Sequence, residues 1–324
     1  MLIRTELAAL RSDDAPQRRA QRALVDAVQQ WRDGPACPGL AADLASYALG
    51  AALTDLRLAR LFDPADLAAA RLTQSLMAVL TRQLEAGPLG QVPLRHQSDG
   101  TQATLVVARH GTAALLLQAT GRPGLARLRP AVSARFTPGD VRERVLAGSA
   151  AARLVTLDRE RPGGAELTVT DCPLAPGAVI CRSGARQTLL VDSPDGLLVT
   201  LKLQRRPASG GLTRAFDLAS GSFIHQAAAA ARDSRLELTA ALLGRMGRTD
   251  AAPMLAAMAE EQADPSLRWQ SLKECLGLDS GAGFAALTRI AACSSDPLAM
   301  PAGALRAQLL ERYPQLAEAA SCRA

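Results

Sequence analysis

Aromatic residues make up only 3% of this 324-residue chain, which also contains just three histidines, His96, His110 and His225. Base-stacking platforms for single-stranded nucleic acid depend on aromatic rings, so this scarcity argues against that kind of binding. Three histidines also leave few candidates for acid–base or metal chemistry. Leucine, valine and alanine must build the core, and a hydrophobic content of 48% is enough for one.

Lysine is almost absent, since all but two of the 37 basic residues are arginine and the exceptions are Lys202 and Lys273. The net charge of +6 could serve nucleic acid, but the arginines are interleaved with acidic residues and form no long block of like charge. We therefore expect a weakly basic, mixed surface. A nucleic-acid-binding regulator, using arginines of residues 18–22 and 205–214, is the weaker alternative.

Long apolar runs are missing as well. No stretch reaches the ~18 uncharged apolar residues that a membrane span needs, and the N-terminal segment lacks the apolar stretch of a signal peptide. The six cysteines are scattered without CxxC spacing, which favours reduced thiols over a disulfide framework. These absences predict a cytoplasmic, bacterial-type protein that does not enter a membrane.

Common catalytic motifs are also absent. The chain has no GxGxxG after a strand, no GxxxxGK[ST], no HExxH and no GxSxG, so nucleotide cradles, zincin sites and nucleophile elbows lack support. His225 lies in "SGSFIHQAAAAA", where we expect a helix start capped by Ser220 or Ser222. The sequence therefore favours a non-catalytic protein.

The chain changes its pattern twice. Residues 1–89 are expected to be helical, because "SDDAPQRRAQRALVDAVQQW" and "FDPADLAAARLTQSLMAVLTRQLEAG" each join an Asp-Pro-type start to an apolar stripe. Residues 90–207 contain short β segments separated by turn signals such as "RPGG" and "SPDG". The strand candidates are "QATLVVA", "AALLLQA", "AARLVTLD", "AELTVTD", "QTLLVD" and "LLVTLKLQR". This pattern predicts an antiparallel barrel or sandwich.

Residues 208–324 return to helices and look repetitive. Asp264 and Asp296 each precede a proline at a helix start, and they lie 32 residues apart. This stretch resembles HEAT or armadillo-like repeats, whose stacked helix pairs offer extended binding surfaces. The resemblance implies that another protein is the partner.

The helix expected after Asp264 supplies the candidate partner residues. With Ser266 as its cap, Leu272, Cys275 and Leu276 form the stripe that should be buried. Arg268 and Lys273 fall outside that stripe and are expected to project outward. Trp269 and Arg268 are candidate anchors, because Trp and Arg dominate interface hot spots.

A second basic cluster lies around a Gly/Ser break in "LQRRPASGGLTRAFD". Arg205, Arg206 and Arg214 are expected to form an exposed loop for an acidic partner, or else the linker between two regions.

The central region also resembles the cupin superfamily, whose small β barrels commonly hold a metal. "RFTPGDVRERVLAG" and "CPLAPGAVICRSGARQTLLVDSPDGLLVTLKLQRR" look like that family's Pro-Gly turns leading into strands. The family's closely spaced histidine pair is not met, because His96 and His110 lie fourteen residues apart. The alternative is a cupin-like enzyme holding one transition metal ion through His96, His110 and a carboxylate of Asp99 or Glu143.

Together these patterns predict an α+β protein with three parts: helices in 1–89, a cupin-like antiparallel barrel or sandwich in 90–207, and a HEAT-like region in 208–324. We expect a non-catalytic interaction or regulatory protein without a cofactor. The helical repeats would bind another protein, and the β region could hold a small ligand.

Overall fold

A computed structural model describes residues 13–121, 131–207 and 210–316 of the chain. The chain is a mixed α+β protein that divides into two compact units. The first unit takes the residues up to 134 together with 139–206, and the second takes residues 135–138 and those from 207 onward. The first unit thus joins the early helices to the larger sheets. The three-part division at residues 89 and 207 stays a prediction.

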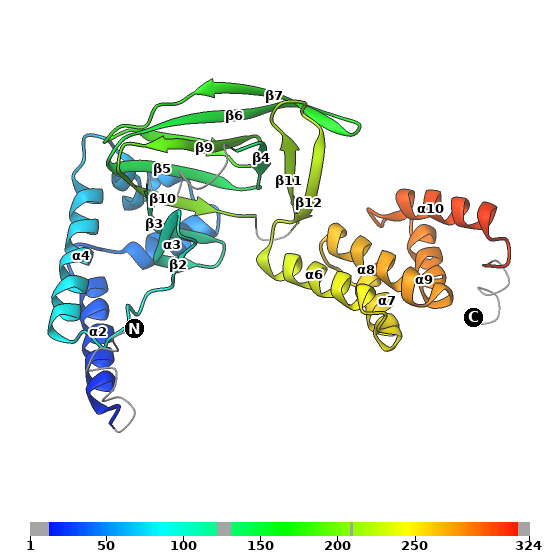
Figure 1. The fold of residues 1–324 in the computed structure, drawn as a ribbon, viewed down its shortest axis with the longest axis horizontal. Helices are drawn as coiled ribbons and strands as arrows, with labels where there is room; N and C mark the ends of the chain where they lie inside the picture. Colours follow the sequence, from blue (N-terminus) through cyan, green and yellow to red (C-terminus); the bar gives the residue numbers. More distant parts are fainter. Residues whose placement is uncertain (1–12, 122–130, 208–209, 317–324) are drawn as a thin grey trace, which may run out of the picture. The chain divides into compact units, whose positions relative to one another are not determined.

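Two long helices, α2 (Ala15–Asp33) and α4 (Ala68–Ala86), lie side by side in the first unit (Figure 1). Leu24 and Val28 of α2 and Leu72 of α4 are buried at helical spacing, as the apolar stripes predict. A hydrogen bond also joins the two helices, because Trp31 Nε1 of α2 donates to Ser75 Oγ of α4 at 2.8 Å. Between these helices lie α3 (Leu40–Ala48) and the 3-10 turns η1 (Leu53–Asp55) and η2 (Arg57–Phe62).

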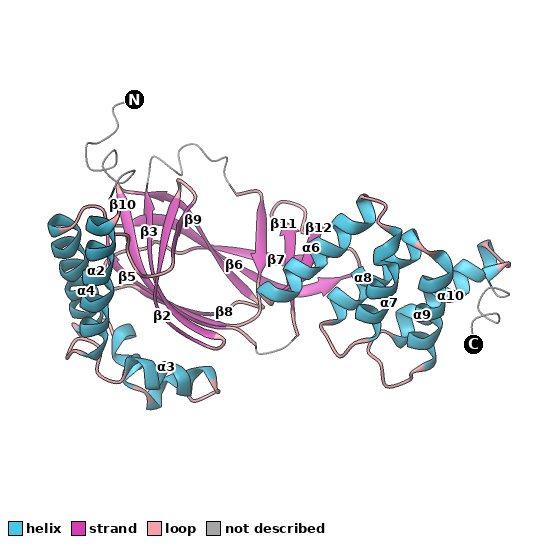
Figure 2. Cartoon of the chain, turned by 90° about the horizontal axis from the view of Figure 1, so that it is seen from below, coloured by secondary structure: helices cyan, strands magenta, loops and turns pink. Residues whose placement is uncertain are grey.

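A six-stranded antiparallel sheet, ordered β1-β2-β3-β10-β5-β8, forms the centre of the first unit (Figure 2). Its strands are β1 (His96–Ser98), β2 (Gln102–His110), β3 (Ala113–Gly121), β5 (Asp140–Ala147), β8 (Val179–Ser183) and β10 (Leu197–Arg205). Because side chains alternate between faces, Leu115, Leu201 and Leu203 all point to the face that the helices cover.

Arg144 fixes the helical segment to this sheet. Its side chain lies on the helix-covered face, and its guanidinium donates to the carbonyl oxygens of Leu61, Pro64 and Asp66 at 3.2, 3.2 and 3.0 Å. Arg144 is buried, so these bonds replace the water that the charge would otherwise hold.

A second antiparallel sheet, ordered β7-β6-β9, faces the first. It contains β6 (Ala150–Arg161), β7 (Gly164–Asp171) and β9 (Gln187–Pro194). Val145 and Leu198 of the large sheet share a buried cluster with Ala150 and Ala152 of β6. The sequence left a barrel or a sandwich open, and the described strands form separate, open sheets and not a closed barrel.

The second unit begins with a small sheet, ordered β12-β11-β4, made of β4 (Ser133–Phe136), β11 (Leu212–Asp217) and β12 (Phe223–Ala228). His225 therefore lies in a strand, opposite Ala215, and the expected helix start there is wrong. Pairing with β11 decides the conformation, because it buries Phe216 and Ala228 where the alanine-rich sequence alone favours a helix.

Helices complete the second unit. They are α6 (Ala231–Arg245), η3 (Thr249–Ala251), α7 (Ala252–Glu260), α8 (Pro265–Leu278), α9 (Ser280–Ala292) and α10 (Ala299–Arg312). Asp264, not Ser266, caps α8, since its Oδ1 accepts from the Ser266 backbone N–H at 2.9 Å. Asp296 accepts from the Leu298 N–H at 2.8 Å in the same way. Each described helix is too short or too polar to span a bilayer.

Candidate partner-binding groove

Two hollows of the second unit meet along α8. One, of ≈ 630 Å³, lies between α8, α6 and β12; the other, of ≈ 640 Å³, lies between α8 and α10. Trp269 and Lys273 line both hollows, so we treat the two as one surface and name it the α8 groove. Two of the residues singled out in the sequence therefore lie at its centre.

The two faces of α8 differ in exposure. Trp269, Lys273 and Leu276 follow one another at i, i+4 and i+7 and turn toward the groove. The other face is buried, and it consists of Leu267, Arg268, Ser271, Leu272 and Cys275. Leu272 and Cys275 thus lie where the apolar spacing predicts. Leu276 is half-buried and lines the groove instead.

The groove is mainly apolar with one cation at its centre. Leucines of α10, Leu305 and Leu309, line its second hollow. Lys273 is exposed, and within the described residues no carboxylate forms an ion pair with its ammonium group. An apolar trough with an uncompensated cation at its centre and the Glu237 carboxylate at one end can bind an apolar segment and favours an acidic group beside Lys273.

The expectation that Arg268 projects outward is wrong. Its guanidinium is buried and pairs with both carboxylate oxygens of Asp296, at 3.1 and 2.5 Å, while its Nε donates to the Ala259 carbonyl at 2.8 Å. The Arg268 hydrogen bond to the Asp296 carboxylate holds the pKa of Asp296 below its ordinary value, against the opposing effect of burial. Arg268 joins α8 to the start of α10 and cannot be a direct partner contact.

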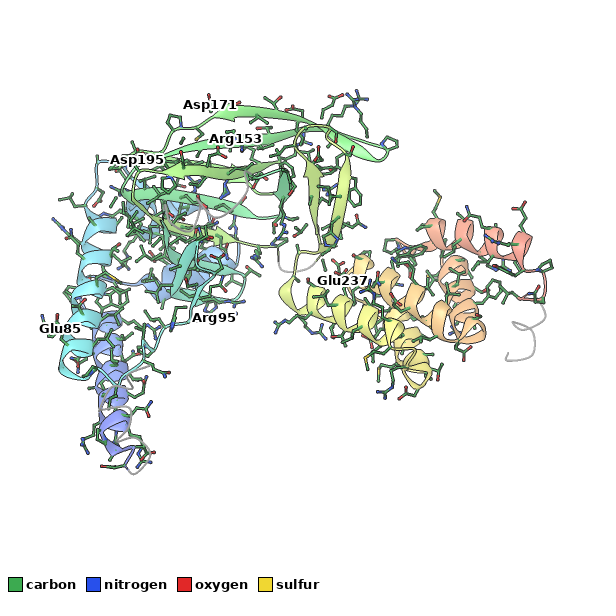
Figure 3. All side chains as sticks on the ribbon, viewed as in Figure 1. Glu85, Arg95, Arg153, Asp171, Asp195 and Glu237 are labelled. Atoms are coloured by element: carbon green, nitrogen blue, oxygen red, sulfur yellow. The ribbon has the colours of Figure 1, made fainter. Side chains whose placement is uncertain are left out.

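Polar groups mark one end of the groove, where β12 meets α6. His225 and Glu237 both line the hollow, and Glu237 lies on α6 (Figure 3). Glu237 Oε2 accepts from the Ala228 backbone N–H at 2.9 Å, and its buried Oε1 has no hydrogen-bond partner among the described residues. Sequence pattern could not predict this end of the groove, because it depends on a strand at residues where the sequence favours a helix.

The basic cluster around residue 210 is not one loop. Arg205 ends β10 and is held by Asp140, Arg206 is exposed, and Arg214 lies within β11 opposite Gln226. Residues 208 and 209 of the expected linker lie outside the described residues. A shared contact of these three arginines with one partner stays a prediction.

The structure keeps the alternative metal ligands apart. His96 pairs with Leu105 and His110 with Ala113, which separates the two histidines by five residues along β2, or roughly 16 Å. Asp99 lies in the turn after β1, where its carboxylate accepts from two backbone N–H groups. No group of three or more His, Cys, Asp or Glu residues within the described ranges could hold a metal ion. The proposed four-residue set is therefore wrong.

Glu143, the remaining member of that set, has a different environment. It is buried on the sheet face opposite the helices, where its Oε1 accepts from Arg182 Nη2 at 2.5 Å and lies 2.9 Å from Lys202 Nζ. Burial opposes ionisation of the carboxyl, but Lys202 and Arg182 outweigh it and hold the pKa of Glu143 below its ordinary value. Glu143 is an ion-pair centre of the sheet.

No protein-family model matches the chain, and no curated protein matches it. Solved structures do show a limited likeness. The capsular polysaccharide assembling protein CapF from Staphylococcus aureus is 11% identical, with a TM-score of 0.26, over 41% of this chain and 34% of CapF. This chain thus matches about a third of CapF's length.

Two further likenesses cover more of the other protein. A cupin-superfamily protein from Desulfitobacterium hafniense is 13% identical over 34% of this chain and 83% of its own, with a TM-score of 0.22. KdgF from Halomonas sp. is 17% identical over 35% and 87%, with a TM-score of 0.24. The Desulfitobacterium hafniense protein is described as a cupin-superfamily protein, and the cupin superfamily is the one that the central region resembles. Similarity this low carries no argument about activity, so the function must be argued from the chain's own geometry.

Proposed function

We propose that this chain is a non-catalytic interaction protein that holds a segment of another protein in the α8 groove. The observation that supports this is the position of Trp269 and Lys273, which both hollows share. A half-buried tryptophan at the centre of a concave apolar surface is the arrangement that concentrates binding energy at protein interfaces.

The occupant that fits is an acidic, amphipathic segment. Its apolar side chains would fill the two hollows against Trp269 and Leu309, and a carboxylate would meet Lys273. A basic segment would bring like charges together in a partly desolvated place and would be rejected. The repeated Asp-Pro sequences at Asp264 and Asp296, where each aspartate accepts from the backbone N–H two residues on, support a HEAT-like origin of this surface.

The test is a selection of 16-residue peptides from a random display library on the intact protein. We expect the selected peptides to combine apolar residues with Asp or Glu. Trp269→Ala and Lys273→Glu should each weaken their binding by about tenfold or more, because both remove a central contact.

Two controls match these variants. Met254→Ala removes an exposed apolar side chain of α7, and Arg245→Glu reverses an exposed charge at the end of α6, and neither residue lines the groove. Unchanged binding in both controls supports the proposal. Peptides without an acidic preference, or peptides that bind Trp269→Ala as tightly as the unaltered protein, would refute it.

A metal-dependent enzyme and a nucleic-acid-binding regulator are less well supported. The metal-dependent enzyme lacks support because the structure keeps its candidate ligands, His96, His110, Asp99 and Glu143, apart. For the second, Arg18 of the first basic cluster is already paired with Asp14 at 2.6 Å on the surface of α2. No observation of the described residues favours either function over partner binding.

A further inference from the structure

The first unit has a hollow of its own, of ≈ 460 Å³, where β5, β8 and β10 approach α3 and η1. We propose that it binds a small oxyanion, the carboxylate or phosphate group of a small molecule. Its polar lining includes Arg142, Arg182, Arg205, Cys181, Ser183 and Gln187, and we name it the arginine hollow. The proposal does not depend on the α8 groove.

Backbone geometry places the arginines together. Gly139 has a φ of +134°, and a Cβ at this position would lie 2.4 Å from the Arg205 carbonyl oxygen. Only glycine therefore allows β5 to begin so close to the end of β10. The register then sets Asp140 opposite both Arg205 and Ser183, and it sets Arg142 opposite Cys181.

The charges around the hollow do not balance. Asp140 is the acidic residue of its lining, and Asp140 Oδ2 forms an ion pair with Arg205 Nη2 at 2.7 Å. The Arg205 guanidinium also lies over the Tyr47 ring, 4.4 Å from the ring centroid. The side chains of Glu143, Arg182 and Lys202 pair with one another on the other face of the sheet, so they do not count toward the charge of the hollow.

Arg142 is the cation left over. Its Nη1 contacts Cys181 Sγ at 3.1 Å, and it forms no ion pair with a carboxylate of the described residues. Two cations, Arg142 and Arg205, thus face one carboxylate, that of Asp140, in a partly buried site, where uncompensated positive charge attracts an anion.

Arg142 provides donors that the described residues leave unused, because its one hydrogen bond runs from Nη1 to Cys181 Sγ. Guanidinium groups match the planar oxygen pairs of carboxylates and phosphates, and the volume falls within the usual range of small-molecule sites.

Cys181 allows a direct test, because it is exposed and lines the hollow. The full chain is treated with iodoacetamide, which is uncharged, in inorganic phosphate, in malonate or in chloride at equal ionic strength. Modification is followed cysteine by cysteine by mass spectrometry. We expect phosphate or malonate to slow the modification of Cys181 but not of Cys293, the exposed cysteine of the second unit. The anion that protects better identifies the ligand class.

Calorimetry on two variants separates this site from general surface charge. Arg142→Gln should weaken binding of the protecting anion by about tenfold or more, as expected for loss of a charge-assisted hydrogen bond. Arg186→Gln removes an exposed arginine on the neighbouring turn that does not line the hollow, and should leave the affinity unchanged.

Three outcomes would overturn the proposal. They are no protection by either anion, equal protection of Cys293, and equal weakening of binding in both variants. If Arg142→Gln does not fold, the NMR signal of the Arg142 Nε–H in the unaltered protein decides instead. A saturable shift of that signal with the protecting anion supports the site, and an unchanged signal refutes it.

Discussion

Asp296→Asn is expected to destabilise the second unit strongly while leaving the turn hydrogen bond before α10 in place. The Arg268 side chain is 5% exposed and that of Asp296 14%, so the substitution leaves a buried guanidinium without its counter-charge. Removing one partner of a buried ion pair costs about 3–5 kcal/mol. Because Asp296 keeps some contact with solvent, we expect the lower end, about 3 kcal/mol.

Two comparison variants separate the effects. The amide of Asp296→Asn retains an oxygen for the Leu298 N–H, whereas Asp296→Ala loses this hydrogen bond as well and should cost about 1 kcal/mol more. The double variant Arg268→Met/Asp296→Asn removes both charges and should recover a large part of the loss, because no unpaired charge then remains buried.

Urea unfolding followed by tryptophan fluorescence can isolate the second unit. The chain has one tryptophan in each unit, Trp31 and Trp269, so a Trp31→Phe background reports on Trp269 alone. With a denaturant slope of about 1.5 kcal/mol/M, Asp296→Asn should lower the midpoint by about 2 M. A shift below about 0.3 M, or a double variant whose loss equals the sum of the single losses, would refute the reasoning.

The same ion pair gives a pH dependence of known sign. The pKa of Asp296 is lowered in the folded protein, so the pair stabilises fully above the unfolded pKa of about 3.9 and is lost as the pH falls through the lower folded value. The stability difference between the unaltered protein and Asp296→Asn should therefore shrink as the pH is lowered below 4. A difference that stays constant down to pH 2 would contradict the assignment.

Two further predictions concern the first unit. Arg144→Met should lower its free energy of unfolding by about 3 kcal/mol, because three carbonyl groups lose their donor; a loss below 1 kcal/mol in thermal unfolding followed by circular dichroism would contradict this. Burial raises the pKa of Cys37 to about 11, with a smaller opposing effect of Arg32. The Cys37 thiol should therefore resist iodoacetamide at pH 8 in the folded protein while Cys181 reacts, and equal rates for the two thiols would show that the site is open.

Local sequence pattern predicted the secondary structure correctly where a helix or strand has one buried and one exposed face. The apolar stripes of residues 15–33 and 68–86 correspond to α2 and α4, and the six quoted strand candidates all fall within β2, β3, β6, β7, β9 and β10. The pattern failed at residues 223–228, where alanine favours a helix but pairing with β11 imposes a strand. Local pattern also could not predict whether the sheets close into a barrel, because strand order depends on pairing between residues far apart in the chain.

Arg268 shows how residue type can mislead where spacing does not. Positions 268, 272 and 275 follow one another at i, i+4 and i+7, so the period of α8 alone places Arg268 on the buried face with Leu272 and Cys275. The prediction set Arg268 outside the stripe although it lies one turn before Leu272, and burial was not expected because an unpaired buried arginine would be very costly. The partner that makes burial possible, Asp296, lies 28 residues away. A charged residue on an apolar stripe therefore predicts a buried ion pair, and an acidic residue at a repeat-related helix start is where its partner should be sought.

The α8 groove marks the limit of this reasoning. Trp269 and Lys273 could be chosen from their residue types and neighbouring positions on one helix. The hollows that these two residues line could not be predicted, because their other lining residues come from β12, α6 and α10, between residues 212 and 316. A concave surface is a property of packed elements, and it is set by long-range contacts that no local period encodes. The sequence could therefore nominate anchor residues, whereas only the fold shows that both of them line the same two hollows.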